Sequence, residues 1–185
     1  MEPFESIRDF TERVLALPSL DIAVLNAGVW HLNFARSKDS FETHIQVNYL
    51  ASCALSLSLL TILGRGRSAP DSRAGRLLNV TSEGHSFETV PTGRCASKVL
   101  ERFKDPNTLT CYKRYRLSKL LSMIWTHELA SSIDSATRNV EIASFTPGAS
   151  QTQICRDLGA GPIVRFLMNF FCQPAEAGAW TYVRA

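Results

Sequence analysis

The stretch "DIAVLNAG", residues 21–28, decides the fold of this 185-residue chain. Four consecutive apolar residues, from Ile22 to Leu25, lead into the small polar segment Asn-Ala-Gly. An apolar run of this length that ends at a turn signal is typical of a strand buried on both faces of a parallel sheet. The sequence therefore predicts a fully buried strand here, and the segments on either side show which fold it belongs to.

Helical patterns flank this strand on both sides. Residues 4–17 place Ile7, Phe10, Val14 and Leu17 at steps of three and four, which is the stripe of a helix that lies against a core. Residues 41–63 form a long apolar segment, which we expect to be a helix that ends at Gly64 in a left-handed cap. The strand thus lies between two helices.

The alternation continues along the rest of the chain. Residues 75–82, "GRLLNVTS", and 139–148, "NVEIASFTPG", are predicted as strands, and 83–111 as a long loop with a helical turn. The predicted helices are 112–131, 161–171 and 174–185, and the first buries Leu117, Leu120, Leu121, Ile124 and Trp125. Regular alternation predicts one α/β domain over residues 1–185 with a parallel sheet.

Composition narrows the classes of protein that the chain can belong to. The formal charge is only +3 and the charges are scattered, so nothing indicates a nucleic-acid partner. Five cysteines without a Cys-x-x-Cys spacing indicate free thiols in a reducing compartment and argue against a zinc site. No secretion signal opens the chain, and the apolar run 49–63 is too short for a membrane span. We therefore expect a cytoplasmic protein without a membrane span.

Small and hydrogen-bonding residues follow each predicted strand. They are Asn26 to Gly28 after the first strand, Thr81 and Ser82 after the second, and Pro147 to Thr152 after the third. Ligands of such sheets bind beyond the carboxyl ends of the strands, so these residues are candidates for a binding site. Asn26 to Gly28 could also be a simple turn, Asn48 in the next helix could cap or kink that helix, and Thr81 could do the same job as Ser82.

The segment "YRLSK", residues 115–119, places Tyr115 one helical turn before Lys119. The two side chains share a helix face, and an ammonium group beside a phenol lowers the phenol pKa from about 10. A phenol with a lowered pKa can act as an acid or base near neutral pH. Taken alone, the spacing is common by chance and favours a solvent-facing pair on a polar stripe, and Tyr112 with Arg116 is a competing pair of the same spacing.

The ordered set of motifs resembles the short-chain dehydrogenase/reductase family along the whole chain. The set comprises "LNAG", Asn48 in "VNYLA", Ser82, "YRLSK" with Ser118 and Lys119, and "PGASQT". The sequence is most similar to members like the retinol dehydrogenases and the reductases of fungal secondary metabolism. The resemblance implies an NAD(P)-dependent oxidoreductase, with NADP favoured, that interconverts a carbonyl and an alcohol. The resemblance is also compatible with a homo-oligomer.

The resemblance implies four catalytic residues. Tyr115 donates or accepts the proton at the substrate oxygen, and Lys119 lowers the pKa of this tyrosine and hydrogen-bonds the nicotinamide ribose. Ser82 holds and polarises the carbonyl, and Asn48 holds a water molecule that continues the proton relay.

The resemblance also implies a set of cofactor contacts. Asn26, Ala27 and Gly28 pack against the cofactor, Thr152 meets its carboxamide or phosphate, and Pro147 and Gly148 shape that turn. Trp30, Phe87 and the loop 83–111 indicate a small, fairly apolar substrate, and His85 is a further candidate for its pocket. The four histidines show no metal-binding spacing, and Ser82 lacks the Gly-x-Ser-x-Gly context of a serine hydrolase.

One part of the family pattern is not found in the sequence. No strand is followed by a glycine-rich turn and a helix, which is the unit that receives the cofactor pyrophosphate. The resemblance therefore implies a truncated, incomplete Rossmann-like doubly wound parallel sheet that lacks its first strands and glycine-rich turn, and in which the strand "DIAVL" is exposed at an edge. Two functions remain open: a reductase, or a non-catalytic remnant that acts as a binding or pairing partner.

Overall fold

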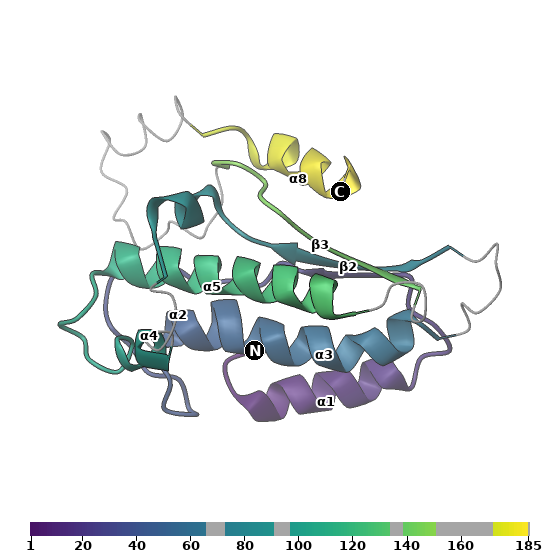
Figure 1. The fold of residues 1–185 in the computed structure, drawn as a ribbon, viewed down its shortest axis with the longest axis horizontal. Helices are drawn as coiled ribbons and strands as arrows, with labels where there is room; N and C mark the ends of the chain where they lie inside the picture. The colour runs from purple at the N-terminus through teal and green to yellow at the C-terminus, as the bar shows by residue number, and fades with distance from the viewer. Residues whose placement is uncertain (66–72, 91–96, 134–138, 151–171, 185) are drawn as a thin grey trace.

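The computed structural model describes residues 1–65, 73–90, 97–133, 139–150 and 172–184. Its elements in chain order are α1 (Phe4–Leu15), β1 (Ile22–Leu25), α2 (Thr43–Ile45), η1 (Gln46–Leu50), α3 (Ala51–Leu63), β2 (Gly75–Val80), η2 (Glu83–Phe87), α4 (Ser97–Glu101), α5 (Cys111–Ser132), β3 (Val140–Phe145) and α8 (Ala175–Arg184). Helices and strands alternate as the sequence predicts (Figure 1).

The described strands form one parallel sheet in the order β1-β2-β3. Ala23 pairs with Leu77 between β1 and β2, and Leu77 pairs with Ile142 between β2 and β3. A parallel sheet connected by helices confirms the predicted α/β class. Because all three strands run in the same direction, their carboxyl ends lie at one edge of the sheet, where a ligand site is expected.

The expectation that β1 is fully buried is wrong. Ala23 and Leu25 are buried, whereas Ile22 is 53% and Val24 41% exposed. In the described sheet β1 pairs only with β2, so it is an edge strand, and alternate side chains point to the face opposite α3. The predicted exposed edge at this strand is confirmed.

Helices α3 and α5 cover one face of the sheet, with α1 packed against α3 (Figure 1). The core between them contains Ile7, Leu59, Leu63 and Leu77, each at most 5% exposed. Helix α8 lies against the other face. Asn79 of β2 faces α5, so the next residue, Val80, faces the opposite side of the sheet. Phe145 of β3 pairs in register with Val80, and its ring centre lies 4.8 Å from that of Tyr182 of α8.

The buried face of α5 is more polar than predicted. Leu117 and Leu120 are buried as expected, but Leu121, Ile124 and Trp125 are only partly buried. The most buried positions include Ser118, Lys119, Ser122 and Thr126. Two of these bind the sheet directly, since the Asn79 side chain donates to Ser122 Oγ at 2.9 Å and to Thr126 Oγ1 at 2.7 Å. Polar groups are tolerated there because each finds a partner.

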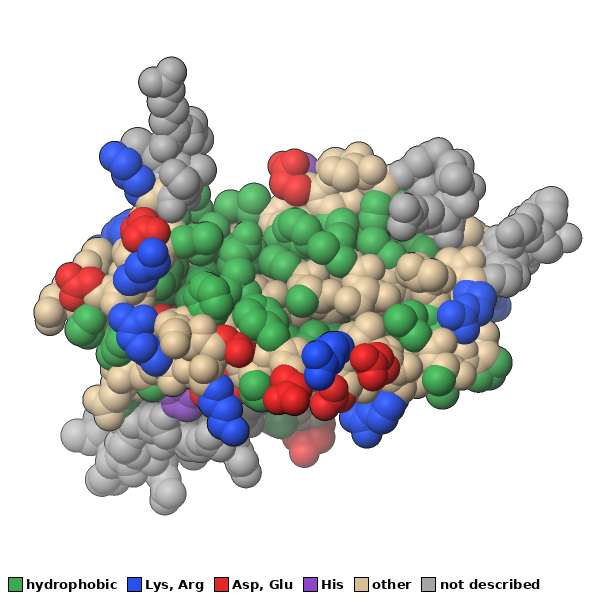
Figure 2. Space-filling model, turned by 90° about the horizontal axis from the view of Figure 1, so that it is seen from below, with side chains coloured by type: hydrophobic (Ala, Val, Ile, Leu, Met, Phe, Trp, Pro, Cys, Tyr) green, Lys and Arg blue, Asp and Glu red, His purple; other side chains and the backbone are tan. Residues whose placement is uncertain are grey.

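Helix α1 has the amphipathic character that the sequence predicts. Ile7 is buried against α3, while Arg8 is exposed within 4.0 Å of carboxylates at Glu5, Asp9 and Glu12. From below, hydrophobic side chains gather in the middle of the face, with charged side chains of both signs along its lower border and left side (Figure 2).

The predicted helix over 41–63 is continuous from α2 through η1 to α3. The 21 residues Thr43–Leu63 are long and apolar enough to span a membrane by composition, with 61% of the most apolar window buried inside the fold. This burial is typical of a core helix. The left-handed cap expected at Gly64 is wrong, because Gly64 has φ −85° and ψ −6° and its N–H still donates to Leu60.

The predicted loop 83–111 contains two short helices, η2 and α4, among its described residues. The predicted helix 174–185 is confirmed as α8. The predicted helix 161–171 lies outside the described residues.

Candidate active site

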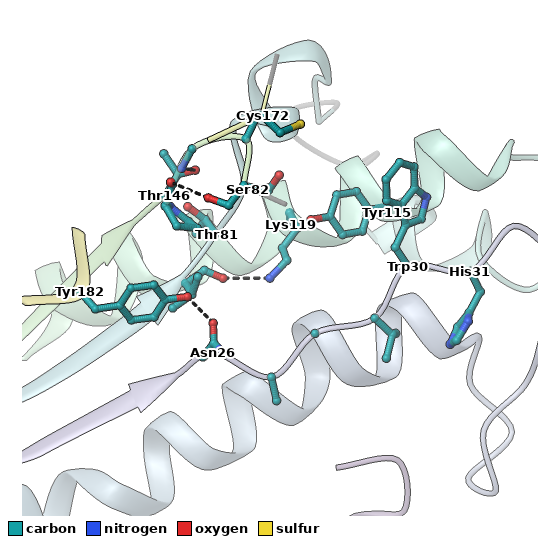
Figure 3. Close-up of a pocket in the computed structure, with 18 residues that line it drawn as sticks. Asn26, Trp30, His31, Thr81, Ser82, Tyr115, Lys119, Thr146, Cys172 and Tyr182 are labelled. Atoms are coloured by element: carbon teal, nitrogen blue, oxygen red, sulfur yellow. Dashed lines mark hydrogen bonds between the residues drawn. The ribbon is translucent and has the colours of Figure 1, made fainter. Parts of the chain in front are cut away.

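A cavity of about 660 Å³ opens at the carboxyl edge of the sheet (Figure 3). It is lined by residues from all three strand ends, from α5 and from the C-terminal region: Asn26, Ala27, Gly28, Val29, Trp30, His31, Val80, Thr81, Ser82, Tyr115, Lys119, Thr146, Pro147, Gly148, Ala149, Ser150, Cys172 and Tyr182. The cavity thus brings together Tyr115, Lys119, Ser82 and the Asn-Ala-Gly turn, which the sequence predicts to share one site.

Helix α5 delivers Tyr115 and Lys119 to this cavity. Thr110 caps its first turn, since the Thr110 hydroxyl accepts a hydrogen bond from Lys113 N–H at 3.3 Å. Lys119 is only 4% exposed, and its Nζ donates to the Val80 carbonyl at 2.9 Å. The pair is therefore not solvent-exposed as a whole, because the lysine is buried at the end of β2.

Burial changes the acidity of Lys119. Removal of the ammonium group from water lowers its pKa from 10.5 to about 8. An ammonium has three N–H donors, and the bond to Val80 uses one of them. Near neutral pH, Lys119 is thus a buried cation that can donate to a ligand in the cavity.

The lowered pKa predicts a specific dependence of stability on pH. The unfolded chain keeps the Lys119 proton up to pH 10.5, whereas the folded chain releases it near pH 8. Between these values the unfolded state binds more protons, so the free energy of unfolding rises with pH, by at most about 3 kcal/mol. Urea unfolding of the wild type and of Lys119→Met across this range measures the difference. Identical pH profiles for the two proteins would contradict the buried ammonium.

The Asn-Ala-Gly turn passes close to the catalytic candidates. A Cβ atom at Gly28 would lie 3.2 Å from Asn48 Oδ1 and 3.3 Å from Lys119 Nζ. Both distances are tighter than ordinary van der Waals contact. Glycine at this position therefore leaves room beside Lys119 on the cavity wall.

Asn48 lies in η1, the π-helical turn between α2 and α3. Its Oδ1 accepts from Val29 N–H at 2.8 Å, and its Nδ2 donates to the Val29 carbonyl at 3.0 Å. Nδ2 also lies 3.0 Å from Ser118 Oγ. Asn48 thus holds the segment after the Asn-Ala-Gly turn against α5, and its predicted role in holding a water molecule stays a prediction. π-Helical turns often occur at functional sites.

The structure distinguishes the two hydroxyl groups after β2. Thr81 is buried, and its hydroxyl donates to the Phe145 carbonyl at 3.1 Å. Ser82 is half-buried and caps η2, where its Oγ accepts from Gly84 N–H at 3.3 Å. An added Cβ at Gly84 would lie 3.5 Å from Ser82 Oγ and 4.0 Å from a ring carbon of Tyr115. Ser82 and the ring of Tyr115 thus both border Gly84, whereas the Thr81 hydroxyl is bound to the backbone at the end of β3.

The turn after β3 forms another part of the cavity wall. Pro147 and Gly148 line the cavity, and Gly148 adopts φ +75°, a left-handed conformation that favours glycine. The Gln173 side chain donates to the Pro147 carbonyl at 2.6 Å and holds the turn in place. Thr152, the third residue predicted here, lies outside the described residues.

Some cavity residues could not be found from the sequence, and three residues expected at the site, Asn48, His85 and Phe87, do not line it. Tyr182 of α8 donates to Asn26 Oδ1 at 2.5 Å, although 156 positions separate them, and no local pattern signals this contact. Cys172 also lines the cavity. His85 and Phe87 were expected in the substrate pocket, but neither lines the cavity, and Phe87 is 71% exposed. Helix η2 turns Phe87 toward Arg116, whose guanidinium lies 5.1 Å from its ring centre.

The groups around the cavity include a buried ammonium and several hydroxyl groups. Lys119 supplies N–H donors that match ribose hydroxyls, and Gly28 leaves space beside it. Tyr115 and Ser82 add two hydroxyl groups to the lining of the same cavity. The cavity therefore has both a region suited to a polar cofactor and a pair of groups suited to proton transfer.

Comparisons with known proteins agree with this arrangement. No protein-family model matches the chain. It is 37% identical over 178 residues to the short chain dehydrogenase sol3 of Alternaria solani, covering 96% of this chain and 60% of sol3. It is 30% identical over 194 residues to the short chain dehydrogenase yanD of Aspergillus niger, covering 100% of this chain and 57% of yanD. The chain thus spans about 60% of the length of these relatives.

Solved structures show the same fold at lower identity. A short-chain dehydrogenase from Sphingobium yanoikuyae in complex with NADPH matches with a TM-score of 0.65 at 13% identity, covering 98% of this chain and 60% of that one. The 3-alpha-hydroxysteroid dehydrogenase of Pseudomonas sp. B-0831, complexed with NADH, matches with a TM-score of 0.62 at 21% identity, covering 90% and 62%. Sequence relatives and fold together show that this chain belongs to the short-chain dehydrogenase/reductase family.

Proposed function

We propose that the protein is an NAD(P)-dependent oxidoreductase that interconverts a carbonyl and an alcohol, with Tyr115 as the proton donor or acceptor. The observation that carries this proposal is the convergence of Tyr115, Lys119 and Ser82 on one cavity, with Lys119 buried. Burial of a cation costs free energy, which is typical of a group retained for its chemistry.

The proposed chemistry divides between cofactor and protein. A bound nicotinamide cofactor supplies or accepts the hydride. Lys119 binds the ribose of this cofactor through its N–H donors, and its positive charge stabilises the phenolate form of Tyr115 from the same helix. Ser82 donates to the substrate oxygen, and the Tyr115 hydroxyl gives that oxygen its proton during reduction. In the reverse direction, the phenolate form of Tyr115 takes up the proton of the alcohol.

The cavity supports a small, fairly apolar substrate. Trp30 stacks on Tyr115 with ring centres 5.2 Å apart and an interplanar angle of 24°. Trp30 also contacts Tyr112 edge to face at 5.5 Å. The acid/base residue therefore adjoins an aromatic wall, which favours an apolar carbonyl compound, such as those of secondary metabolism, over a highly charged one.

Titration with NADPH tests the proposed function. Binding beside Trp30 is expected to quench tryptophan fluorescence in a saturable manner, because Trp30 lines the cavity. Free tryptophan measured at the same NADPH concentrations corrects for absorption of the exciting light. A flat titration of protein that is folded by circular dichroism would refute cofactor binding and favour the non-catalytic alternative.

A further inference from the structure

A buried charged cluster lies directly behind the aromatic wall of the cavity. It consists of Glu42, His44 and Arg114, whose side chains are at most 4% exposed. Glu42 caps α2, since its Oε2 accepts from Ile45 N–H at 3.1 Å. None of the three lines the cavity, and the proposed chemistry makes no use of them.

The hydrogen bonds of His44 define its protonation state. Its Nε2 lies 3.0 Å from the backbone nitrogen of His31, and that N–H can only donate. Nε2 therefore accepts and carries no proton. Nδ1 lies 2.5 Å from Glu42 Oε1, a carboxylate oxygen that accepts, so Nδ1 carries the proton and donates it. His44 is thus the neutral Nδ1–H tautomer, held from both sides.

Arg114 explains why a neutral histidine is compatible with a buried carboxylate. Its Nε lies 3.4 Å from Glu42 Oε1, so the guanidinium balances the charge of Glu42. Arg114 Nη1 also donates to the Leu109 carbonyl at 2.6 Å. Its guanidinium lies 5.4 Å from the ring centre of Phe34. The cluster therefore joins the segment after β1, helix α2 and the loop before α5.

The cluster reaches Tyr115 by two short routes. On the first route, His44 accepts a hydrogen bond from the His31 amide, which fixes the backbone directly after Trp30, and Trp30 stacks on Tyr115. The ring of His44 also contacts the ring of Tyr115 edge to face, with centres 6.4 Å apart. Tyr115 is thus held between a stacked indole and a buried imidazole.

From this geometry we propose that His44, as the neutral Nδ1–H tautomer oriented by Glu42, is a positioning residue that fixes Trp30 and the phenol of Tyr115 for proton transfer. The inference rests on the proposed function for its effect on turnover. The tautomer of His44 and its link to Trp30 do not depend on the proposed function. Proton transfer requires the phenol within hydrogen-bond reach of the substrate oxygen, so small displacements of the ring reduce the rate.

Two substitutions separate positioning from simple packing. His44→Leu fills the space of the imidazole with an apolar side chain, and it removes both the acceptor for the His31 amide and the donor to Glu42. His44→Gln keeps a carbonyl oxygen near the position of Nε2 and can still accept from that amide. His127→Leu is the matched control, because His127 lies on α5 with 79% of its side chain exposed.

Kinetics with NADPH and nitrobenzaldehyde as the probe aldehyde measure the effect on turnover. We expect His44→Leu to lower kcat about 100-fold, as for a misplaced reacting group, with little change in KM. His44→Gln should recover most of the lost kcat, and His127→Leu should match the wild type. Equal kcat in His44→Leu and the wild type, or an equal loss in His44→Gln and His44→Leu, would overturn the positioning role.

Two readouts do not depend on activity. Nitrogen-15 spectra of histidine side chains should show a protonated Nδ1 and a bare Nε2 for the residue whose signals vanish in His44→Gln. A protonated Nε2 at neutral pH would overturn the inference, even if His44→Leu does not fold. Near-ultraviolet circular dichroism should also change in His44→Leu, and this change should disappear in a Trp30→Phe background. A change that persists there would break the link between His44 and Trp30.

The two proposals fail in different ways. If the wild type shows no turnover and no NADPH binding, the proposed function fails, while the tautomer and the Trp30 signal still test the link. If the wild type turns over but His44→Leu is equally active, the positioning role fails and the proposed function stands.

Discussion

Tyr115→Phe is expected to abolish turnover while the protein stays folded. The substitution removes the only group of this side chain that can exchange a proton, and general acid–base catalysis is worth about 10²- to 10⁴-fold in rate. The ring remains, so the stacking on Trp30 and the edge contact with His44 are kept. Steady-state kinetics measure the loss, and urea unfolding checks that the free energy of unfolding is close to that of the wild type.

Tyr112→Phe is the matched control for this experiment. Tyr112 lies one turn earlier on α5, is 45% exposed, and also contacts Trp30. It loses a hydroxyl of the same kind but does not line the cavity. We expect wild-type turnover from Tyr112→Phe. Full activity in Tyr115→Phe would exclude Tyr115 as the acid/base.

Lys119→Met is expected to weaken NADPH binding strongly. Methionine has a similar length but no charge and no N–H donors, so the contact with the cofactor ribose is lost. Hydrogen bonds from a charged group contribute about 1.5 to 3 kcal/mol, which corresponds to a loss of affinity of about 10- to 100-fold. Fluorescence titration with NADPH measures the dissociation constant, and turnover should fall as well because the phenolate of Tyr115 loses its stabilising charge.

Lys113→Met controls for the loss of one positive charge from α5. Lys113 is exposed near the start of the helix and does not line the cavity. Its substitution should leave the dissociation constant for NADPH unchanged. If Lys119→Met binds NADPH as tightly as Lys113→Met does, Lys119 is not the ribose contact.

The class of fold was predictable because it depends on local patterns. The apolar runs at 22–25 and 75–80 and the helical stripe of α1 are visible in short windows, and each forms the expected element. The burial of β1 was mispredicted because a run of four apolar residues looks the same in a central strand and in an edge strand. Only pairing decides between them, and pairing joins residues far apart in the sequence.

The candidate site was predictable where residue types follow strand ends in order. Tyr115, Lys119, Ser82 and the Asn-Ala-Gly turn line one cavity, as the motifs indicate. Tyr182 escaped prediction because its bond to Asn26 spans most of the chain. His85 and Phe87 were placed wrongly because proximity to Ser82 in sequence says nothing about the direction in which η2 turns their side chains.

The sequence alone thus determined the α/β alternation, the parallel sheet and the set of chemically capable residues, because hydrophobic period and strand-end residues are local properties. Only the tertiary structure decided which of these residues are buried and what they touch. Lys119 can be buried because the Val80 carbonyl accepts a hydrogen bond from its ammonium group, and Glu42 can be buried because Arg114 balances its charge. A polar group leaves water only when a partner compensates its desolvation, and these partners are brought together by the fold.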